Sequence, residues 1–309
     1  MRNAFAAAIT DLAARDDRIV LLSGDIGNRL FDTFRERFPD RFYNCGVAEA
    51  NMTGMAAGLA LSGLRPFTYT ITPFATTRVI EQIRVDICYH DVPVVIVGTG
   101  SGLSYASLGP THHSCEDVGI LRCFPNLTVL CPADSAEVGP ALGATLSLPG
   151  PAYIRLGKKG EPVVHDTPPA FEIGRGIVMR EGADVCLLGM GTMTAVALEA
   201  ATILAENGLS AKVVSMHTVK PLDETLLADA FGRFKAVAVV EEHSVIGGLG
   251  SAVAEWLARR DGPQPPLVAC GTPDAFISEA GSQHWMRQQC GLTGPAVAAK
   301  ILGRLEGGR

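Results

Sequence analysis

Short runs of aliphatic and β-branched residues alternate with helix-length segments along the whole chain. This alternation is typical of a mostly parallel sheet that is covered by helices. The runs in the first half predict strands at residues 18–24, 67–71, 93–98, 127–132 and 152–156. Those in the second half predict strands at residues 184–190, 211–217, 236–242 and 265–271, with helices near residues 193–207 and 248–260.

The stretch GKKGEPVVHDTPP, at residues 157–169, interrupts this rhythm with glycine, proline and charged residues. Such a composition is typical of a linker. We therefore predict an α/β protein of two three-layer α/β/α domains with mostly parallel sheets, at residues 1–165 and 166–309. The two halves show no sequence repeat.

The composition excludes several classes of protein. A chain of 309 residues, 47% hydrophobic and with 34 glycines, suits two compact domains rather than disorder. The net charge of −6 provides no basic stripe for nucleic acid, and no apolar run has the length of a membrane span. Asp11 interrupts the apolar N-terminal run, which predicts an amphipathic helix rather than a signal peptide, and a cytoplasmic protein.

Motifs that could bind a metal or a nucleotide are weak. The eight cysteines contain no C-x-x-C pair and are predicted to be buried thiols. His112 and His113 are adjacent, and adjacent side chains rarely chelate one metal, so we expect no metal site on this chain. Three glycine turns, at residues 24–27, 189–192 and 247–250, lack the full dinucleotide fingerprint and a P-loop lysine, which favours plain tight turns.

Two positions stand out as candidates for chemistry. Glu49 lies at the start of an almost wholly apolar segment, residues 43–63, that predicts a packed helix. Burying a lone carboxylate is costly, but the helix dipole favours a glutamate in a first helical turn, and the local pattern by itself favours this second interpretation. His112 ends a glycine- and serine-rich loop after a predicted strand, where open α/β sheets bind ligands. From the residues alone, a solvated loop histidine is an equal alternative.

Four long motifs follow one another at natural spacing: FRERFPDRFYNCGVAEANMTGMAAGLALSGLRPF, GPTHHSCEDVGILRCFPNLTVLCPAD, VVSMHTVKPLDETLL and VVEEHSVIGGLGSAVAE. Together they resemble the thiamine diphosphate enzymes of the transketolase family, specifically their pyrimidine-binding and C-terminal domains. The last two motifs look like the C-terminal domain, which 1-deoxyxylulose-5-phosphate synthase and the β subunits of 2-oxoacid dehydrogenases share.

The resemblance implies roles for individual residues. Glu49 matches the glutamate that hydrogen-bonds the aminopyrimidine ring of thiamine diphosphate and activates the cofactor, and apolar surroundings strengthen such a bond. His112 matches the histidine near the reacting carbon, a proton shuttle or oxyanion donor. Phe74 is expected to stack on the pyrimidine, although a gap-free alignment places Ala75 there. Asp25 matches an acidic position near the cofactor across a dimer interface.

The resemblance also concerns the substrate. Arg155 matches an arginine that holds the sugar phosphate in relatives, with Lys158 nearby, and an arginine fork suits phosphate. An ion pair or a linker contact is the alternative for Arg155. Gly100 replaces a histidine of transketolases that act on sugar phosphates, and Leu108 replaces an aspartate that recognises the donor hydroxyl. These departures imply a less polar loop and a specialised substrate.

One domain of the family is missing from the pattern. The diphosphate-binding domain carries a G-D-G…N metal motif, whereas GDIG here has Ile26 in place of the second glycine. The resemblance therefore implies the C-terminal subunit of a split transketolase, with the diphosphate and Mg²⁺ ligands on an N-terminal partner chain in an α₂β₂ heterotetramer. The expected activity is transfer of a two-carbon ketol unit from a ketose to an aldehyde. Decarboxylating chemistry on pyruvate or another 2-oxoacid, and a non-catalytic regulatory subunit, are the alternatives.

Overall fold

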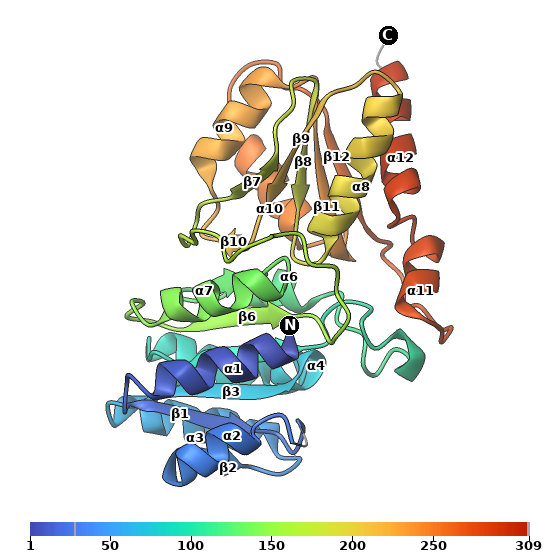
Figure 1. Cartoon of the computed structure of the whole chain (residues 1–309). Coiled ribbons are helices and arrows are strands. Elements are labelled where there is room, and N and C mark those ends of the chain that lie inside the picture. Colours follow the sequence, from blue (N-terminus) through green and yellow to red (C-terminus); the bar gives the residue numbers. More distant parts are fainter. Residues whose placement is uncertain (28, 308–309) are drawn as a thin grey trace.

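The computed structural model describes residues 1–27 and 29–307 and consists of two α/β units, one stacked on the other (Figure 1). The N-terminal unit is built on a seven-stranded sheet with the order β10-β5-β6-β4-β3-β1-β2. Neighbouring strands are parallel except for β10, which pairs antiparallel with β5. The strands of this sheet are β1 (Ile19–Ser23), β2 (Phe42–Asn44), β3 (Arg65–Ile71), β4 (Val95–Thr99), β5 (Thr128–Leu130), β6 (Ala152–Leu156) and β10 (Thr218–Lys220).

The C-terminal unit is built on a five-stranded sheet with the order β12-β11-β8-β9-β7. Its strands are parallel except for β7, which pairs antiparallel with β9. Its strands are β7 (Ile177–Arg180), β8 (Val185–Gly189), β9 (Ala211–Ser215), β11 (Ala236–Ser244) and β12 (Leu267–Thr272). Both sheets are thus mostly parallel, which confirms the predicted α/β fold class.

Helices cover both faces of each sheet. The α-helices are α1 (Arg2–Ala13), α2 (Asp32–Arg37), α3 (Glu49–Leu61), α4 (Thr72–Ala75), α5 (Ile80–Gln82), α6 (Asp117–Leu121), α7 (Ser135–Thr145), α8 (Met193–Glu206), α9 (Glu224–Arg233), α10 (Leu249–Leu257), α11 (Gln283–Gln289) and α12 (Gly294–Glu306). Short 3₁₀ turns are η1 (Pro39–Arg41), η2 (Thr77–Val79) and η4 (Ala106–Leu108), and η3 (Ile83–Tyr89) is a π-helical turn.

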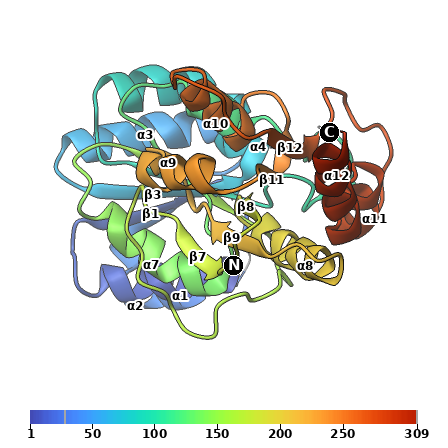
Figure 2. The ribbon, with the colours of Figure 1, turned by 90° about the horizontal axis from the view of Figure 1, so that it is seen from above.

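Two apolar layers enclose the first sheet. On one face, Phe5 of α1, Phe34 of α2 and Leu142 of α7 pack on the strands. On the other face, Met52 of α3 and Ile83 of η3 belong to a second core. That second core continues into the C-terminal unit through its helices α9 and α10, while α8 and α12 cover the opposite face of the second sheet (Figure 2). The two units therefore share part of one hydrophobic core.

The central strands explain why the apolar runs were visible in the sequence. Strands β1, β4, β6 and β8 are buried along their whole length. A strand that helices cover on both faces is apolar at most positions, so it reads as a nearly continuous run rather than an alternation. The carboxyl ends of β1, β3 and β4 lie side by side, because these strands are parallel neighbours.

Strands β2 and β7 were not among the predicted strands, and neither was the least expected one, β10. It follows β9 of the second sheet, yet it joins the first sheet at the edge beside β5. Three residues have no periodicity of their own, so only the tertiary pairing defines this strand. The predicted domain boundary lies between β6 and β7, in a segment without helix or strand, and stays a prediction. Residues 308 and 309 of the predicted second domain lie outside the described residues.

The eight cysteines are free thiols, and five of them are buried. Cys123 is exposed, which differs from the prediction that these thiols are buried. Across residues 1–27 and 29–307 no helix is long and apolar enough to cross a membrane.

Candidate active site

The candidate site lies where the carboxyl ends of the parallel strands in the first sheet meet. Glu49 is the first residue of α3, and Phe74 lies in α4, directly after β3. His112 lies in the loop that follows β4. Sites at this edge of a sheet are usual because each strand there is followed by a loop or a helix start. Three segments that are separate in the sequence thus contribute to one region.

Glu49 is only 3% exposed, and its Oε2 accepts a hydrogen bond of 2.9 Å from Nη1 of Arg78. The turn after β1 packs closely on it: a Cβ added to Gly24 would lie 3.5 Å from Glu49 Cγ and 2.9 Å from Thr70 Oγ1. The glycine at position 24 is therefore explained by close packing, as its tight-turn interpretation predicts. The guanidinium of Arg78 balances the charge of the buried carboxylate.

Arg78 also contacts the aromatic ring at the site. Its guanidinium carbon lies 3.7 Å from the ring centroid of Phe74, so the guanidinium connects the ring to the Glu49 carboxylate. Arg78 itself is 43% exposed. Our sequence analysis missed Arg78, although a buried carboxylate requires a charge partner and Arg78 is the first cation after Phe74.

Phe74 and His112 are in direct contact. Their ring centroids are 5.3 Å apart at an interplanar angle of 67°. Nδ1 of His112 lies 2.9 Å from Oγ1 of Thr111, which orients the imidazole. Ala75 is buried and has no ring to stack, so the geometry favours Phe74 over the gap-free alternative. Glu49, Phe74 and His112 are therefore brought together, with Arg78 between the first two.

The second histidine faces a different space. Nε2 of His113 is buried without a hydrogen-bond partner, and burial lowers the pKa of His113. His113 lines a cavity of about 570 Å³ between the first unit and the loop after β12, which includes Phe276. Thr111 and Pro73, the chain neighbours of His112 and Phe74, also line this cavity.

The structure explains why glycine occupies position 100, one of the two departures from the family pattern. Gly100 has φ +76°, and a Cβ added there would lie 1.9 Å from Cε2 of Tyr105. The Tyr105 ring thus fills the space that a side chain at position 100 would need. Its centroid is 6.1 Å from that of His112 and 4.5 Å from Nζ of Lys158. Burial raises the pKa of the Tyr105 phenol. Leu108, the other departure, is exposed at the end of η4.

We expect Gly100→Ala to reduce the free energy of unfolding by about 2–4 kcal/mol, since it combines a left-handed backbone with overpacking against a buried ring. Chemical denaturation measures the change. Gly63→Ala is the matched control, because Gly63 has φ +93° but nothing within 4 Å of an added Cβ. In a Tyr105→Ala background, Gly100→Ala should reduce the free energy of unfolding no more than Gly63→Ala does. Equal losses at positions 63 and 100 would contradict the role of Tyr105.

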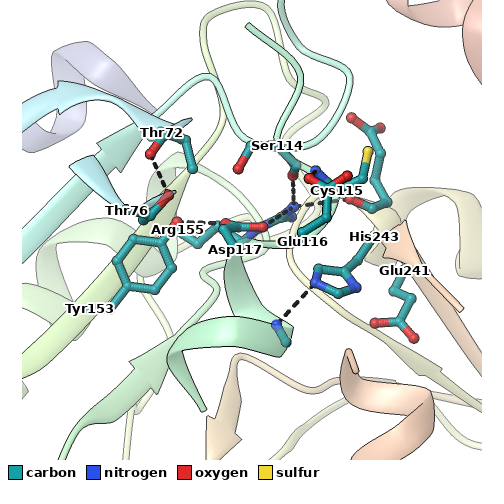
Figure 3. Close-up of polar contacts among 12 residues, drawn as sticks. Thr72, Thr76, Ser114, Cys115, Glu116, Asp117, Tyr153, Arg155, Glu241 and His243 are labelled. Carbon is teal, nitrogen blue, oxygen red and sulfur yellow. Dashed lines mark hydrogen bonds and ion pairs between the residues drawn. The ribbon is translucent and has the colours of Figure 1, made fainter. Parts of the chain in front are cut away.

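Arg155 has a different environment from the one its predicted role requires. It is buried in β6, and its Nε and Nη2 donate to Asp117 at 2.8 and 3.1 Å (Figure 3). Nη2 also donates to the carbonyl oxygens of Ser114 and Glu242. These internal acceptors occupy the edge of the guanidinium that would hold a phosphate. The structure thus favours the ion-pair alternative for Arg155, and it is a buried pair.

Asp117 and Arg155 each stabilise the charged form of the other. Burial alone would raise the pKa of Asp117, but the Arg155 guanidinium outweighs it, and the pKa lies below its usual value. Burial likewise opposes the charge of Arg155, yet Asp117 raises its pKa. The Tyr153 hydroxyl donates to the same carboxylate at 2.6 Å. Since Arg155 also binds a carbonyl of β11, the pair connects the two units.

A second contact between the units lies beside this pair. The amide of Gly119 in α6 donates to Nε2 of His243 at 3.1 Å, and Figure 3 shows His243 and Glu241 on the side of the cluster away from Thr72. Burial lowers the pKa of His243, which keeps the imidazole neutral and able to accept this bond. The cluster therefore has a structural role, joining α6 to β11.

Asp25 lies at another cavity. Its Oδ1 accepts a hydrogen bond of 2.9 Å from Nδ2 of Asn44 on the edge strand β2. With Asn44 it lines a cavity of about 930 Å³. Asp25 is exposed, and its side chain is directed to the sheet edge rather than to Glu49. A role across a dimer interface stays a prediction.

Two family models match the chain. The transketolase pyrimidine-binding domain matches residues 1–161, and the transketolase C-terminal domain matches residues 174–297. Together with the two sheets, these matches define a protein made of the last two domains of a transketolase-type enzyme. The chain belongs to the transketolase family, as the sequence motifs predicted.

Relatives of the same length are transketolase subunits. The chain is 39% identical over 298 residues to the 6-deoxy-6-sulfo-D-fructose transketolase subunit SqwH of Clostridium sp. (strain MSTE9), covering 96% of this chain and 92% of the relative. It is 37% identical over 264 residues to a subunit of the apulose-4-phosphate transketolase of Actinobacillus succinogenes, covering 85% of each. By contrast, it spans 47% of a 1-deoxy-D-xylulose-5-phosphate synthase of Chlorobium phaeovibrioides, at 35% identity.

Solved structures agree with this assignment. A split gene transketolase, described as an inactive beta4 tetramer, superposes with a TM-score of 0.91 at 39% identity and covers 99% of this chain and 98% of that one. The transketolase of Leishmania mexicana superposes with a TM-score of 0.81, at 21% identity and over 45% of its length, which shows the fold alone.

The family implies thiamine diphosphate, and the residues present fit its pyrimidine half. The Arg78 guanidinium is a planar, nitrogen-rich group that stacks on Phe74 and donates to Glu49. It therefore acts as a stand-in and demonstrates that these two side chains can hold a flat N–H donor between them. An aminopyrimidine also has a flat face with nitrogen atoms in its plane.

Proposed function

We propose that this chain is the catalytic β-type subunit of a split, thiamine diphosphate-dependent transketolase. It transfers a two-carbon ketol unit from a ketose to an aldehyde. The observation that carries this proposal is the buried Glu49 carboxylate beside Phe74 and His112, in a chain that matches transketolase subunits over nearly its whole length. A purely structural subunit has no need of an acid at that position.

Each residue of the site has a distinct task. When bound, thiamine diphosphate supplies the nucleophilic carbon that takes up the ketol unit. Glu49 hydrogen-bonds the pyrimidine ring in surroundings of low polarity, where such a bond is strong. Phe74 fixes the plane of that ring. His112 has Nδ1 engaged by Thr111, which leaves Nε2 to exchange a proton with a substrate hydroxyl.

The substrate is an anionic sugar. The names of two relatives specify a sulfo-sugar and a sugar phosphate, and sulfonate and phosphate are both tetrahedral anions. We assign the contact with this anion to Lys158 rather than to Arg155, because Lys158 is partly exposed after β6 and lies over Tyr105, beside His112. Arg155 is already paired with Asp117.

The diphosphate and Mg²⁺ ligands belong to a separate N-terminal chain, in an α₂β₂ heterotetramer. Two relatives, matched over 92% and 85% of their own length, carry the word subunit in their names, which supports a partner. The split gene transketolase of beta subunits alone is described as inactive. The present chain is also expected to be inactive by itself, because the diphosphate and Mg²⁺ ligands lie on the partner chain.

The test is to assemble the chain with a partner that carries the G-D-G…N motif, add thiamine diphosphate and Mg²⁺, and offer either xylulose 5-phosphate or pyruvate with an aldehyde acceptor. An aldose product from the ketose without release of CO₂ is expected. Release of CO₂ from pyruvate would support the decarboxylating alternative, which the match to 1-deoxy-D-xylulose-5-phosphate synthase keeps in view. Turnover of neither donor by a complex that has bound its cofactor would support a regulatory subunit instead.

A further inference from the structure

The proposed function gives no role to Arg78, although this residue contacts both Glu49 and Phe74. Its guanidinium donates from Nη1 to Glu49 Oε2 at 2.9 Å and lies 3.7 Å from the centroid of Phe74. It thus engages the two side chains that the proposed function assigns to the pyrimidine ring. A ring that stacked on Phe74 and accepted a bond from, or donated one to, Glu49 would need the same space.

The chemistry of the two groups is alike. A guanidinium is planar and delocalised, stacks on aromatic faces and presents N–H donors in its plane. An aminopyrimidine is also planar, and it stacks and presents ring and amino nitrogens in one plane. Phe74 can stack on either group, and Glu49 can hydrogen-bond either: its carboxylate accepts from the guanidinium, and its protonated carboxyl donates to a neutral ring nitrogen. Two groups on the same face of Phe74 exclude one another.

The backbone allows Arg78 to leave. Arg78 lies in η2, which is one short 3₁₀ turn. Its side chain is 43% exposed, whereas that of Glu49 is 3% exposed. Water can replace the carboxylate as the partner of a half-exposed guanidinium at low cost. The Arg155–Asp117 pair is the contrast, because both of its partners are buried and have no such exit.

We propose that Arg78 is a placeholder for the aminopyrimidine of thiamine diphosphate. In the chain by itself its guanidinium pairs with Glu49 and covers the Phe74 ring. When the cofactor arrives, Arg78 swings into solvent and yields both partners to the ring. Arg78 is thus a positioning residue that maintains the site and competes with the ligand. The inference rests on the proposed function, since it needs Glu49 and Phe74 to be the pyrimidine site.

The test uses the full chain and the pyrimidine half of the vitamin, 4-amino-5-hydroxymethyl-2-methylpyrimidine, in a calorimetric or saturation-transfer NMR titration. If the pair is closed in about nine molecules of ten, Arg78→Ala binds this probe about tenfold more tightly than wild type. Loss of a merely structural residue would weaken binding, so the direction of the change is diagnostic. Arg84→Ala is the matched control, because Arg84 is an exposed arginine that pairs with Glu81 on the next turn. The control should bind like wild type.

The double variant Glu49→Ala/Arg78→Ala should lose the gained affinity, which assigns the binding to this site. Equal binding by wild type and Arg78→Ala overturns the placeholder while leaving Glu49 and Phe74 as the pyrimidine site. Binding by neither protein also overturns it, because removal of the guanidinium then opens nothing. The proposed function is tested apart from this, by turnover of the assembled enzyme, so its failure can be recognised separately.

Discussion

Replacing Glu49 with glutamine lowers the turnover of the assembled enzyme by about 10²–10⁴-fold or more, because the cofactor loses the carboxyl that polarises its ring. Glutamine keeps the size of the side chain and an oxygen that can accept the bond from Arg78. The fold should therefore stay intact. Single-turnover and steady-state rates with the ketose donor measure the first effect, and denaturant unfolding measures the second.

Glu81→Gln provides the control for this experiment. Glu81 is an exposed glutamate, paired with Arg84, on the helical segment that follows Phe74. It should retain wild-type turnover, so that any general effect of losing a carboxylate nearby is accounted for. Wild-type turnover by Glu49→Gln would remove the mechanistic basis of the proposed function. Unfolding of Glu49→Gln would be resolved by Glu49→Asp, which keeps the charge but shortens the reach.

Replacing Asp117 with asparagine lowers the free energy of unfolding by about 3–5 kcal/mol, since it leaves the buried Arg155 charge without its partner. The Tyr153 hydroxyl also loses its ionised acceptor. Chemical denaturation at neutral pH measures the loss. Asp229→Asn, which breaks the exposed pair between Asp229 and Arg233, is the matched control and should remain close to wild type.

The double variant Asp117→Asn/Arg155→Met should recover part of this loss, because it removes both charges together. The pH dependence has a defined sign. The folded pKa of Asp117 lies below its ordinary value of 3.8, so its stabilisation is present at neutral pH and is lost as the pH falls through the folded value. If Arg155 held the substrate instead, Asp117→Asn would change the KM for the sugar with little loss of stability.

Most of the fold could be predicted from the chain because the central strands are buried on both faces. Their continuous apolar runs, such as the one at β8, are visible without any partner strand. Helix α8 could also be predicted, because its apolar residues repeat at helical spacing and are buried on one side. Strand β10 was not predictable, because three residues acquire strand geometry only by pairing with β5.

The candidate site divides in the same way. The family motifs identified Glu49 and His112. The local pattern by itself favoured a helix-dipole role for Glu49 and left a solvated loop histidine as an equal alternative for His112. Arg78, Asp117 and Tyr105 were missed, since each acquires its role from a residue that the chain brings close only on folding. The resemblance assigned Arg155 to a sugar phosphate and left an ion pair as the alternative. Its partner, Asp117, lies on a different element and could not be named from the sequence.

The order of apolar and polar residues, with four long motifs, determined on its own the α/β class, the family and the place of the buried glutamate. These properties depend on local periodicity and on residue identity, which a linear chain carries completely. The tertiary structure alone decided which charges neutralise one another: Arg78 pairs with Glu49, and Arg155 with Asp117. A buried charge pairs with the opposite charge that lies closest to it in the folded chain. The distance between side chains on different elements cannot be derived from their spacing in the sequence.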